Sequence, residues 1–208
     1  MDTTHIGIVC TDEFPDIIIN KFIEDIKSEK LRIEIRKFHY GIVASAFDWA
    51  LPTMISVYIL KPYFESFLQE LGKEHYQLLK TWLTNVSIDS RKIKAVTLRA
   101  TKASQKETFS DTQSKAFSIS LITKDDRSIK VLFDLELNDI LWNNAVDQIL
   151  DLLLDNYENF PNDMLTKKLS ELTNNKDSGI FVIIDNESGG LTFYDMNKLI
   201  QNDRERLR

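Results

Sequence analysis

The sequence has few cysteines and histidines, which form cross-links and metal sites, and few glycines and prolines, which shape turns. Its 208 residues include one cysteine, six glycines, four prolines and three histidines. The single cysteine, Cys10, has no partner for an internal disulfide, which predicts a protein of a reducing compartment. Cys10 lies in the apolar run Ile6-Gly7-Ile8-Val9-Cys10, so we expect a small buried side chain, with a reactive thiol as the alternative. A chain of this length can bury a core without such cross-links.

Motifs for metal binding, nucleotide binding and nucleophilic catalysis are also missing. The histidines His5, His39 and His75 fall on separate predicted elements and form no HxH or HExxH pattern, so we predict no metal site built on them. The sequence has no phosphate-binding loop, no dinucleotide-binding glycine pattern and no Gly-x-Ser-x-Gly elbow. Catalytic groups can converge from distant positions, so these absences weaken the case for an enzyme without excluding one. We expect no cofactor.

Basic residues are in deficit. The chain has 26 lysines and arginines against 32 aspartates and glutamates, a formal net charge of −6. Binding to nucleic acid irrespective of sequence needs a cationic surface that neutralises phosphates, so we expect no nucleic-acid partner. Two stretches, Leu31–Lys37 and Arg91–Lys102, are richer in basic residues. Their charges alternate with apolar residues, which indicates solvated strand faces; a local basic patch is the alternative.

One segment, Ile42–Leu60, is long and apolar enough to resemble a membrane helix. Asp48 within it would cost about 2.5 to 3.5 kcal/mol in a bilayer, and Pro52 would break the helix. We therefore expect a buried helix and no membrane span. The start Met1-Asp2-Thr3-Thr4 has no export signal, so a cytoplasmic protein is expected. The composition, rich in Ile, Lys and Asn, is typical of bacteria with AT-rich genomes.

Hydrophobic periodicity predicts an α+β fold. A strand at His5–Cys10, a helix from Pro15 to about Ser28 and a strand at Leu31–Tyr40 suggest a parallel pair with a crossover. An apolar helical layer follows as far as Leu83, and then three antiparallel strands form a meander. We expect one domain over residues 1–208, with a division into 1–86 and 91–208 as the alternative. The remaining predicted elements are the meander strands Lys92–Thr101, Ala116–Thr123 and Ser128–Asp134, the helices Leu137–Tyr157 and Met164–Leu172, a hairpin of Ile180–Ile184 and Leu191–Tyr194, and a last helix capped by Asp195.

Three carboxylates are the candidate catalytic residues. Asp134, Glu136 and Asp139 follow an apolar strand and open a helix. Carboxylates in this position can collect a divalent cation, as in metal-dependent hydrolases. Acidic residues at a helix start also complement the helix dipole, and no lysine stands beside these three to complete a nuclease-like set.

Aromatic residues in the predicted helical layer are the candidate interaction surface. Most should belong to the core, but a layer this apolar can leave a residual patch for a partner or a second copy. The candidates are Trp49, Tyr58, Tyr63, Phe67 and Trp82.

The order of elements in residues 5–134 carries one resemblance. The strand–helix–strand start, the helix end Leu79-Lys80-Thr81-Trp82-Leu83 and the strands after it resemble the small effector-associated modules encoded beside bacterial defence and signalling systems. No motif residue transfers a site. The resemblance implies an adaptor role through protein–protein contacts. We therefore expect a non-catalytic regulatory or adaptor subunit of a bacterial multi-component system that binds a protein partner or itself. The alternatives are a metal-dependent hydrolase and an immunity- or antitoxin-type inhibitor of a basic partner.

Overall fold

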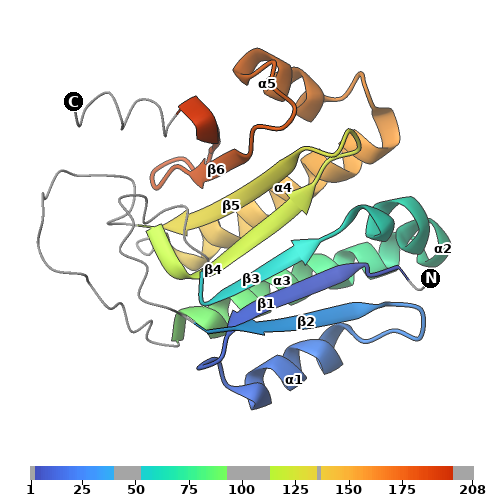
Figure 1. Ribbon diagram of the computed structural model, residues 1–208, viewed down its shortest axis with the longest axis vertical. Coiled ribbons are helices and arrows are strands. Elements are labelled where there is room, and N and C mark those ends of the chain that lie inside the picture. The colour runs from blue at the N-terminus through green and yellow to red at the C-terminus, as the bar shows by residue number, and fades with distance from the viewer. Residues whose placement is uncertain (1–2, 40–52, 93–112, 135–136, 199–208) are drawn as a thin grey trace, which may run out of the picture.

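The computed structural model describes residues 3–39, 53–92, 113–134 and 137–198. In these ranges seven strands form one mixed sheet in the order β2-β1-β3-β4-β5-β6-β7, with helices between them along the chain (Figure 1). The strands are β1 (Ile6–Thr11), β2 (Ile33–Phe38), β3 (Ile55–Ile59), β4 (Gln113–Ile122), β5 (Ser128–Asp134), β6 (Ile180–Ile184) and β7 (Leu191–Asp195). The helices are α1 (Asp16–Ile26), the π-helix η2 (Tyr63–Phe67), α2 (Leu68–Leu71), α3 (Lys73–Lys92), α4 (Asp139–Asn159) and α5 (Met164–Leu172).

The sheet consists of three strand–helix–strand units and a final edge strand. The pairs β1/β2, β3/β4 and β5/β6 are parallel, and helices connect the two strands of each pair, as a parallel crossover requires. Adjacent units run in opposite directions, because β1/β3 and β4/β5 pair antiparallel, and β7 pairs antiparallel with β6. Helices are therefore interspersed among the strands and separate the two strands of each parallel pair, and the class is mixed α/β rather than the predicted α+β.

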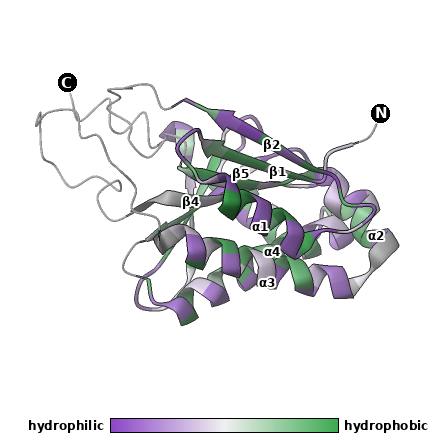
Figure 2. Cartoon of the chain, turned by 90° about the horizontal axis from the view of Figure 1, so that it is seen from below, coloured by the Kyte–Doolittle hydropathy of each residue, from purple (hydrophilic) through white to green (hydrophobic). Residues whose placement is uncertain are grey.

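Helices α1, α3 and α4 cover one face of the sheet (Figure 2). The strands turn alternate side chains toward them, and these are fully buried in β1, β3, β4 and β5. The helices add large apolar side chains at helical spacing to the same cluster. The core on this face includes Ile6, Ile8, Cys10, Val57, Ile119, Val131, Phe22, Leu79, Trp82, Trp142 and Ile149.

The opposite face carries a different set of side chains. Cross-strand neighbours along one row of this face are Gly7, Tyr58, Ser120, Lys130, Phe181 and Tyr194. Leu132 and Phe181 form a second small apolar cluster there, with Tyr194 and Met196 packed against it.

The helix predicted over Ile42–Leu60 is wrong in the part that the structure describes. Residues Ile55–Ile59 form strand β3, between β1 and β4 in the sheet. Its β-branched residues alternate with Ser56 and Tyr58, which suits a strand with one face in the core. Residues 40–52 lie outside the described ranges. None of the helices in the described ranges is both long enough and apolar enough to cross a membrane.

The predicted meander is confirmed only in its β4–β5 hairpin. Residues 93–101 of the first predicted strand lie outside the described residues, and β4 instead has β3 as its parallel neighbour. Helix α3 continues through Lys92, past the position considered for a domain division. The parallel β1–β2 pair, helices α4 and α5 and the β6–β7 hairpin agree with the prediction to within two residues, and the Asp195 carboxylate accepts hydrogen bonds from the backbone N–H groups of Asn197 and Lys198.

Candidate functional site

The aromatic candidates separate into buried, half-buried and undescribed residues. Tyr63, Phe67 and Trp82 are at most 2% exposed. The indole Nε1 of Trp82 donates a hydrogen bond of 2.6 Å to the carbonyl oxygen of Phe22, which ties α3 to α1. These three side chains therefore pack the core and do not reach the surface. Tyr58 is half-buried on the sheet face opposite the helices, and Trp49 lies outside the described residues.

The structure describes only one of the three carboxylate candidates. The side chains of Asp134 and Glu136 lie outside the description, and Asp139 is exposed in the first turn of α4. That helix is capped by Asn138, whose side-chain oxygen accepts a hydrogen bond of 2.9 Å from the N–H of Leu141. In the described part of the chain, no three His, Cys, Asp or Glu side chains come together as metal ligands. Metal-dependent hydrolysis stays a prediction.

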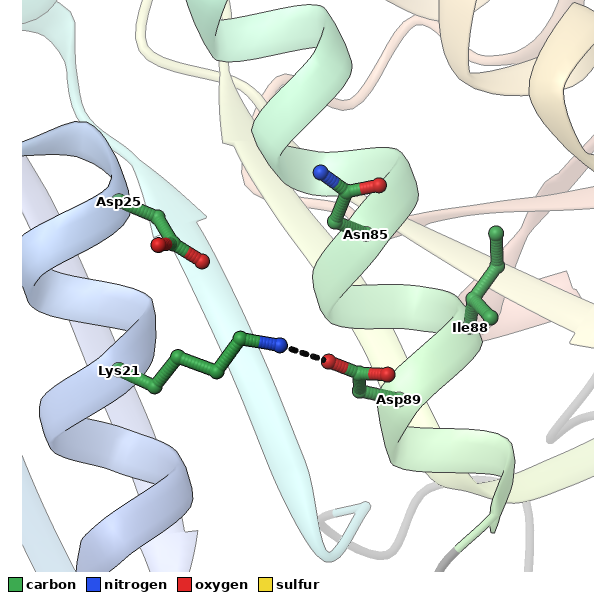
Figure 3. Close-up of a pocket in the computed structure, with 5 residues that line it drawn as sticks. All are labelled: Lys21, Asp25, Asn85, Ile88 and Asp89. Atoms are coloured by element: carbon green, nitrogen blue, oxygen red, sulfur yellow. Dashed lines mark hydrogen bonds and ion pairs between the residues drawn. The ribbon is translucent and has the colours of Figure 1, made fainter.

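A groove of about 520 Å³ lies between α1 and α3 (Figure 3). The Lys21 ammonium reaches across it to the Asp89 carboxylate at 2.8 Å. This hydrogen bond raises the pKa of Lys21 above its ordinary value. Asp25, Asn85 and Ile88 complete the lining. The bridge joins the two helices at the surface, and we assign the groove to helix packing.

Among the described strands, β2 forms one edge of the sheet and has β1 as its only neighbour. In a parallel pair, the N–H and C=O of one residue point to the same neighbouring strand, and those of the next residue point away. The N–H of Ile6 donates to the Arg32 carbonyl at 3.2 Å, and the N–H of Asp12 donates to the Phe38 carbonyl at 3.0 Å. Even-numbered residues of β2 therefore bond to β1. The N–H and C=O groups of Ile33, Ile35 and Lys37 point outward, and we call this row the β2 edge.

The side chains of β2 leave this edge accessible. Ile35 is 39% exposed, an unusually large apolar exposure for a strand. Glu34 and Arg36 lie on the other face of the strand and form an ion pair of 2.7 Å. Lysines commonly protect edge strands against an added strand. Here the Lys37 ammonium is drawn sideways to the Asp16 carboxylate of α1, at 2.6 Å, and this partner raises its pKa.

The opposite edge of the sheet, β7, is more enclosed. Helix α5 contacts β7, and the Lys168 ammonium lies 5.4 Å from the ring centre of Phe193. Only Thr192 of β7 is exposed, whereas Glu34 through Lys37 are all exposed in β2. The sheet therefore offers its more accessible hydrogen-bonding edge at β2.

A second surface feature is a row of carboxylates on α4. Asp147, Asp151 and Asp155 recur every four residues, which places them along one side of the helix. The sequence of α4 contains no lysine or arginine. Lys80 of α3 lies 3.6 Å from Asp147 and 2.7 Å from Asp151 and neutralises part of this charge.

The sequence indicated β2 as a strand with basic residues but did not show that it lies at an edge. An edge position is indicated by the charges of β2, since its six residues combine acidic and basic side chains with Ile33 and Ile35. Interior strands seldom carry so many charges. No family model, curated protein or solved structure matches this chain. The assignment of function therefore depends on the residues themselves.

Proposed function

We propose that the protein is a non-catalytic interaction subunit that binds an extended segment of a protein partner along the β2 edge. The observation that carries this proposal is the outward backbone row of Ile33, Ile35 and Lys37 beside the exposed Ile35 side chain. An added strand binds through main-chain hydrogen bonds, and alternate side chains give it specificity. The same mode suits a regulatory or adaptor subunit of a bacterial multi-component system, the role that the resemblance of residues 5–134 implies.

The charges of β2 favour a defined partner sequence over general adhesion. Glu34 and Arg36 project on one face of the strand and Ile35 on the other. A partner strand must therefore place charges and an apolar residue in matching alternation. Like charges directly opposite each other in a sheet are destabilising, so mismatched strands would be rejected.

Selection from a displayed random-peptide library on the immobilised protein tests this function. Ile35→Pro removes an outward N–H that β1 does not use, so the variant should fold while losing the β2 edge. We expect selected peptides with alternating apolar and charged residues that bind the wild type and not Ile35→Pro. Circular dichroism and thermal melting verify its fold. Ile35→Thr, with Ile140→Thr as a matched change of a 73% exposed isoleucine on α4, gives a second comparison. Peptides that bind wild type and Ile35→Pro equally would contradict the proposal.

The carboxylate row of α4 favours a second candidate, an immunity- or antitoxin-type inhibitor of a basic protein. An acidic row can complement a basic surface and accelerate association at low salt. We expect a complex with a basic protein encoded nearby to weaken as salt rises, and Asp147→Asn with Asp155→Asn to weaken it further. Asp177→Asn with Glu187→Gln, both in exposed loops, removes the same number of charges and serves as the matched control. Equal loss in both variants would exclude the α4 row.

A further inference from the structure

We infer that β2 can accept the β2 strand of a second copy of this chain, paired antiparallel about Ile35. This inference rests on the proposed use of the β2 edge and adds the identity and register of one partner. A two-fold axis through Ile35 would join the two sheets into one continuous sheet. Such a contact uses the same surface on both copies and closes on itself, so it forms a dimer and not a fibre.

The backbone of β2 has the right phase for this pairing. In an antiparallel pair, residues that face each other's strand exchange both of their hydrogen bonds. Ile35 points its N–H and C=O outward, so it can pair with the Ile35 of a second copy. The same register sets Ile33 opposite the second copy's Lys37. A centre on Glu34 or Arg36 would use the same outward groups, but it would set glutamate opposite glutamate or arginine opposite arginine, which is destabilising.

The side chains of β2 are complementary to themselves in this register. Glu34 of each copy stands directly opposite Arg36 of the other, so two opposite-charge pairs form on one face. On the other face the two Ile35 side chains meet, which covers an isoleucine that is 39% exposed in the single chain. The Lys37 amine is held toward Asp16 at 2.6 Å, away from the joining strand.

Other outward-facing centres fit less well. A centre on Ile33 would set Arg36 against Lys30 of the second copy and leave the end of the strand unpaired. A centre on Lys37 would leave Glu34 opposite a residue beyond the end of β2. Only the centre on Ile35 uses the whole strand and matches both charges. One strand pair is a small contact compared with a stable dimer interface, so we expect a reversible dimer whose population depends on concentration.

Paired charge changes test both the dimer and its register. Glu34→Arg sets arginine against arginine across the axis, and Arg36→Glu sets glutamate against glutamate. By sedimentation equilibrium, we expect each single variant to dissociate about tenfold more readily than the wild type, because two favourable pairs become two repulsive ones. A mixture of the two variants restores both pairs, as does the double variant Glu34→Arg/Arg36→Glu, so both samples should dimerise within about threefold of the wild type.

The possible outcomes distinguish a failure of the dimer, a failure of its register and a failure of the proposed function. A wild type that stays monomeric at millimolar concentration overturns the inference, while peptide binding lost in Ile35→Pro would still support the proposed function. A dimer that persists in Ile35→Pro places the contact elsewhere and also overturns it. A dimer lost in Ile35→Pro but unchanged in both single charge variants overturns the register. Dimerisation restored in the mixture and in the double variant supports the register about Ile35.

Discussion

The two faces of the sheet are built from alternate residues of the same strands, yet they achieve burial by different means. On the helix-covered face the strands present Ile8, Val57 and Ile119, all at 0% exposure. On the other face, Ser56 and Ser118 are also buried, at 3% and 0%. Burial in this protein is therefore not restricted to apolar side chains. Polar groups in such positions need hydrogen-bond partners, because an unpaired buried group is costly.

The serines on the second face find these partners in one another. Thr53 Oγ1 lies 2.7 Å from the hydroxyl oxygens of both Ser56 and Ser118. It also lies 2.9 Å from the Ile55 carbonyl oxygen, and the two serine hydroxyl oxygens are 2.9 Å from each other. Three hydroxyls supply one hydrogen each, so the four contacts compete and only three can be hydrogen bonds at one moment. Burial on the helix-covered face is stabilised by close packing and by the apolar area removed from water. Burial of the three hydroxyls on the second face is stabilised by the hydrogen bonds that they share.

The largest expected effect lies on the helix-covered face. Trp142 is fully buried, and its ring stacks on Phe133 with centroids 4.2 Å apart. Trp142→Ala should lower the free energy of unfolding by about 3 to 5 kcal/mol, through lost transfer energy and the cavity left behind. Urea denaturation measures this change. Tyr58→Ala, on the second face, should cost clearly less, and equal losses would remove the distinction between the faces.

A smaller effect is expected at Lys130 on the second face. Burial lowers the pKa of its ammonium group to about 8, below the value near 10.4 of an unfolded chain. The unfolded state therefore binds more protons between about pH 8 and 10, and this group makes stability rise with pH in that window. Lys130→Met should abolish this rise and add about 1 to 3 kcal/mol at pH 7. Denaturation at pH 7 and 10 decides the point; a variant that keeps the rise contradicts it.

A weaker pH effect should arise beneath the other face, at His75. Burial lowers the pKa of its imidazole, and the Tyr63 hydroxyl lies 3.1 Å from its Nδ1. Protonation then favours the unfolded chain, so stability should fall as the pH drops below about 6.5. His75→Gln should make the pH dependence of thermal melting shallower between pH 6.5 and 5. Tyr63→Phe, which keeps the imidazole, should retain the slope.

The smallest expected change in stability is at the Ser118 hydroxyl group. Ser118→Ala removes one hydrogen and one acceptor, and Thr53 and Ser56 can still bond to each other and to the Ile55 carbonyl. We expect a loss below about 1 kcal/mol. Thr53→Val removes the hydroxyl that takes part in three of the four contacts and should cost more in the same urea titration. The reverse order would show that the three groups do not share their hydrogens.

Local patterns were sufficient to predict most elements of the fold. Helix α5 and strand β5 have their predicted ends, because Asp163 is an N-cap and the Asp125-Asp126 turn bounds the strand. Two elements differ: helix α3, predicted only as far as Leu83, continues to Lys92, and β3 is a short apolar run inside a longer one. Periodicity cannot separate a strand from a buried helix in a run of this kind. The partners of β3, on β1 and β4, are far away in sequence and decide the outcome.

The candidate site was harder to predict for the same reason. The sequence of β2 is enough to predict a strand. Its place at the edge of the sheet depends on long-range pairing, because β1 has β3 as its other neighbour. The aromatic residues were noticeable in the sequence, yet Tyr63 and Trp82 proved to be core. Large apolar side chains are more often buried than functional, and no pattern in one sequence shows which of them remain outside.

The three strand–helix–strand units also have a consequence for how the chain reaches its folded state. In the first unit, β1 and β2 lie 27 positions apart in their pairing, so that contact closes a short loop. The pairing of β3 with β4 spans 62 positions and pays a larger loop-closure entropy. Contacts that are local in sequence form early at the least entropic cost. Of the three parallel pairs, β1/β2 therefore closes the shortest loop and is expected to form before β3/β4; its hydrogen-bonded amides should exchange with solvent more slowly than the outward N–H groups of Ile33, Ile35 and Lys37.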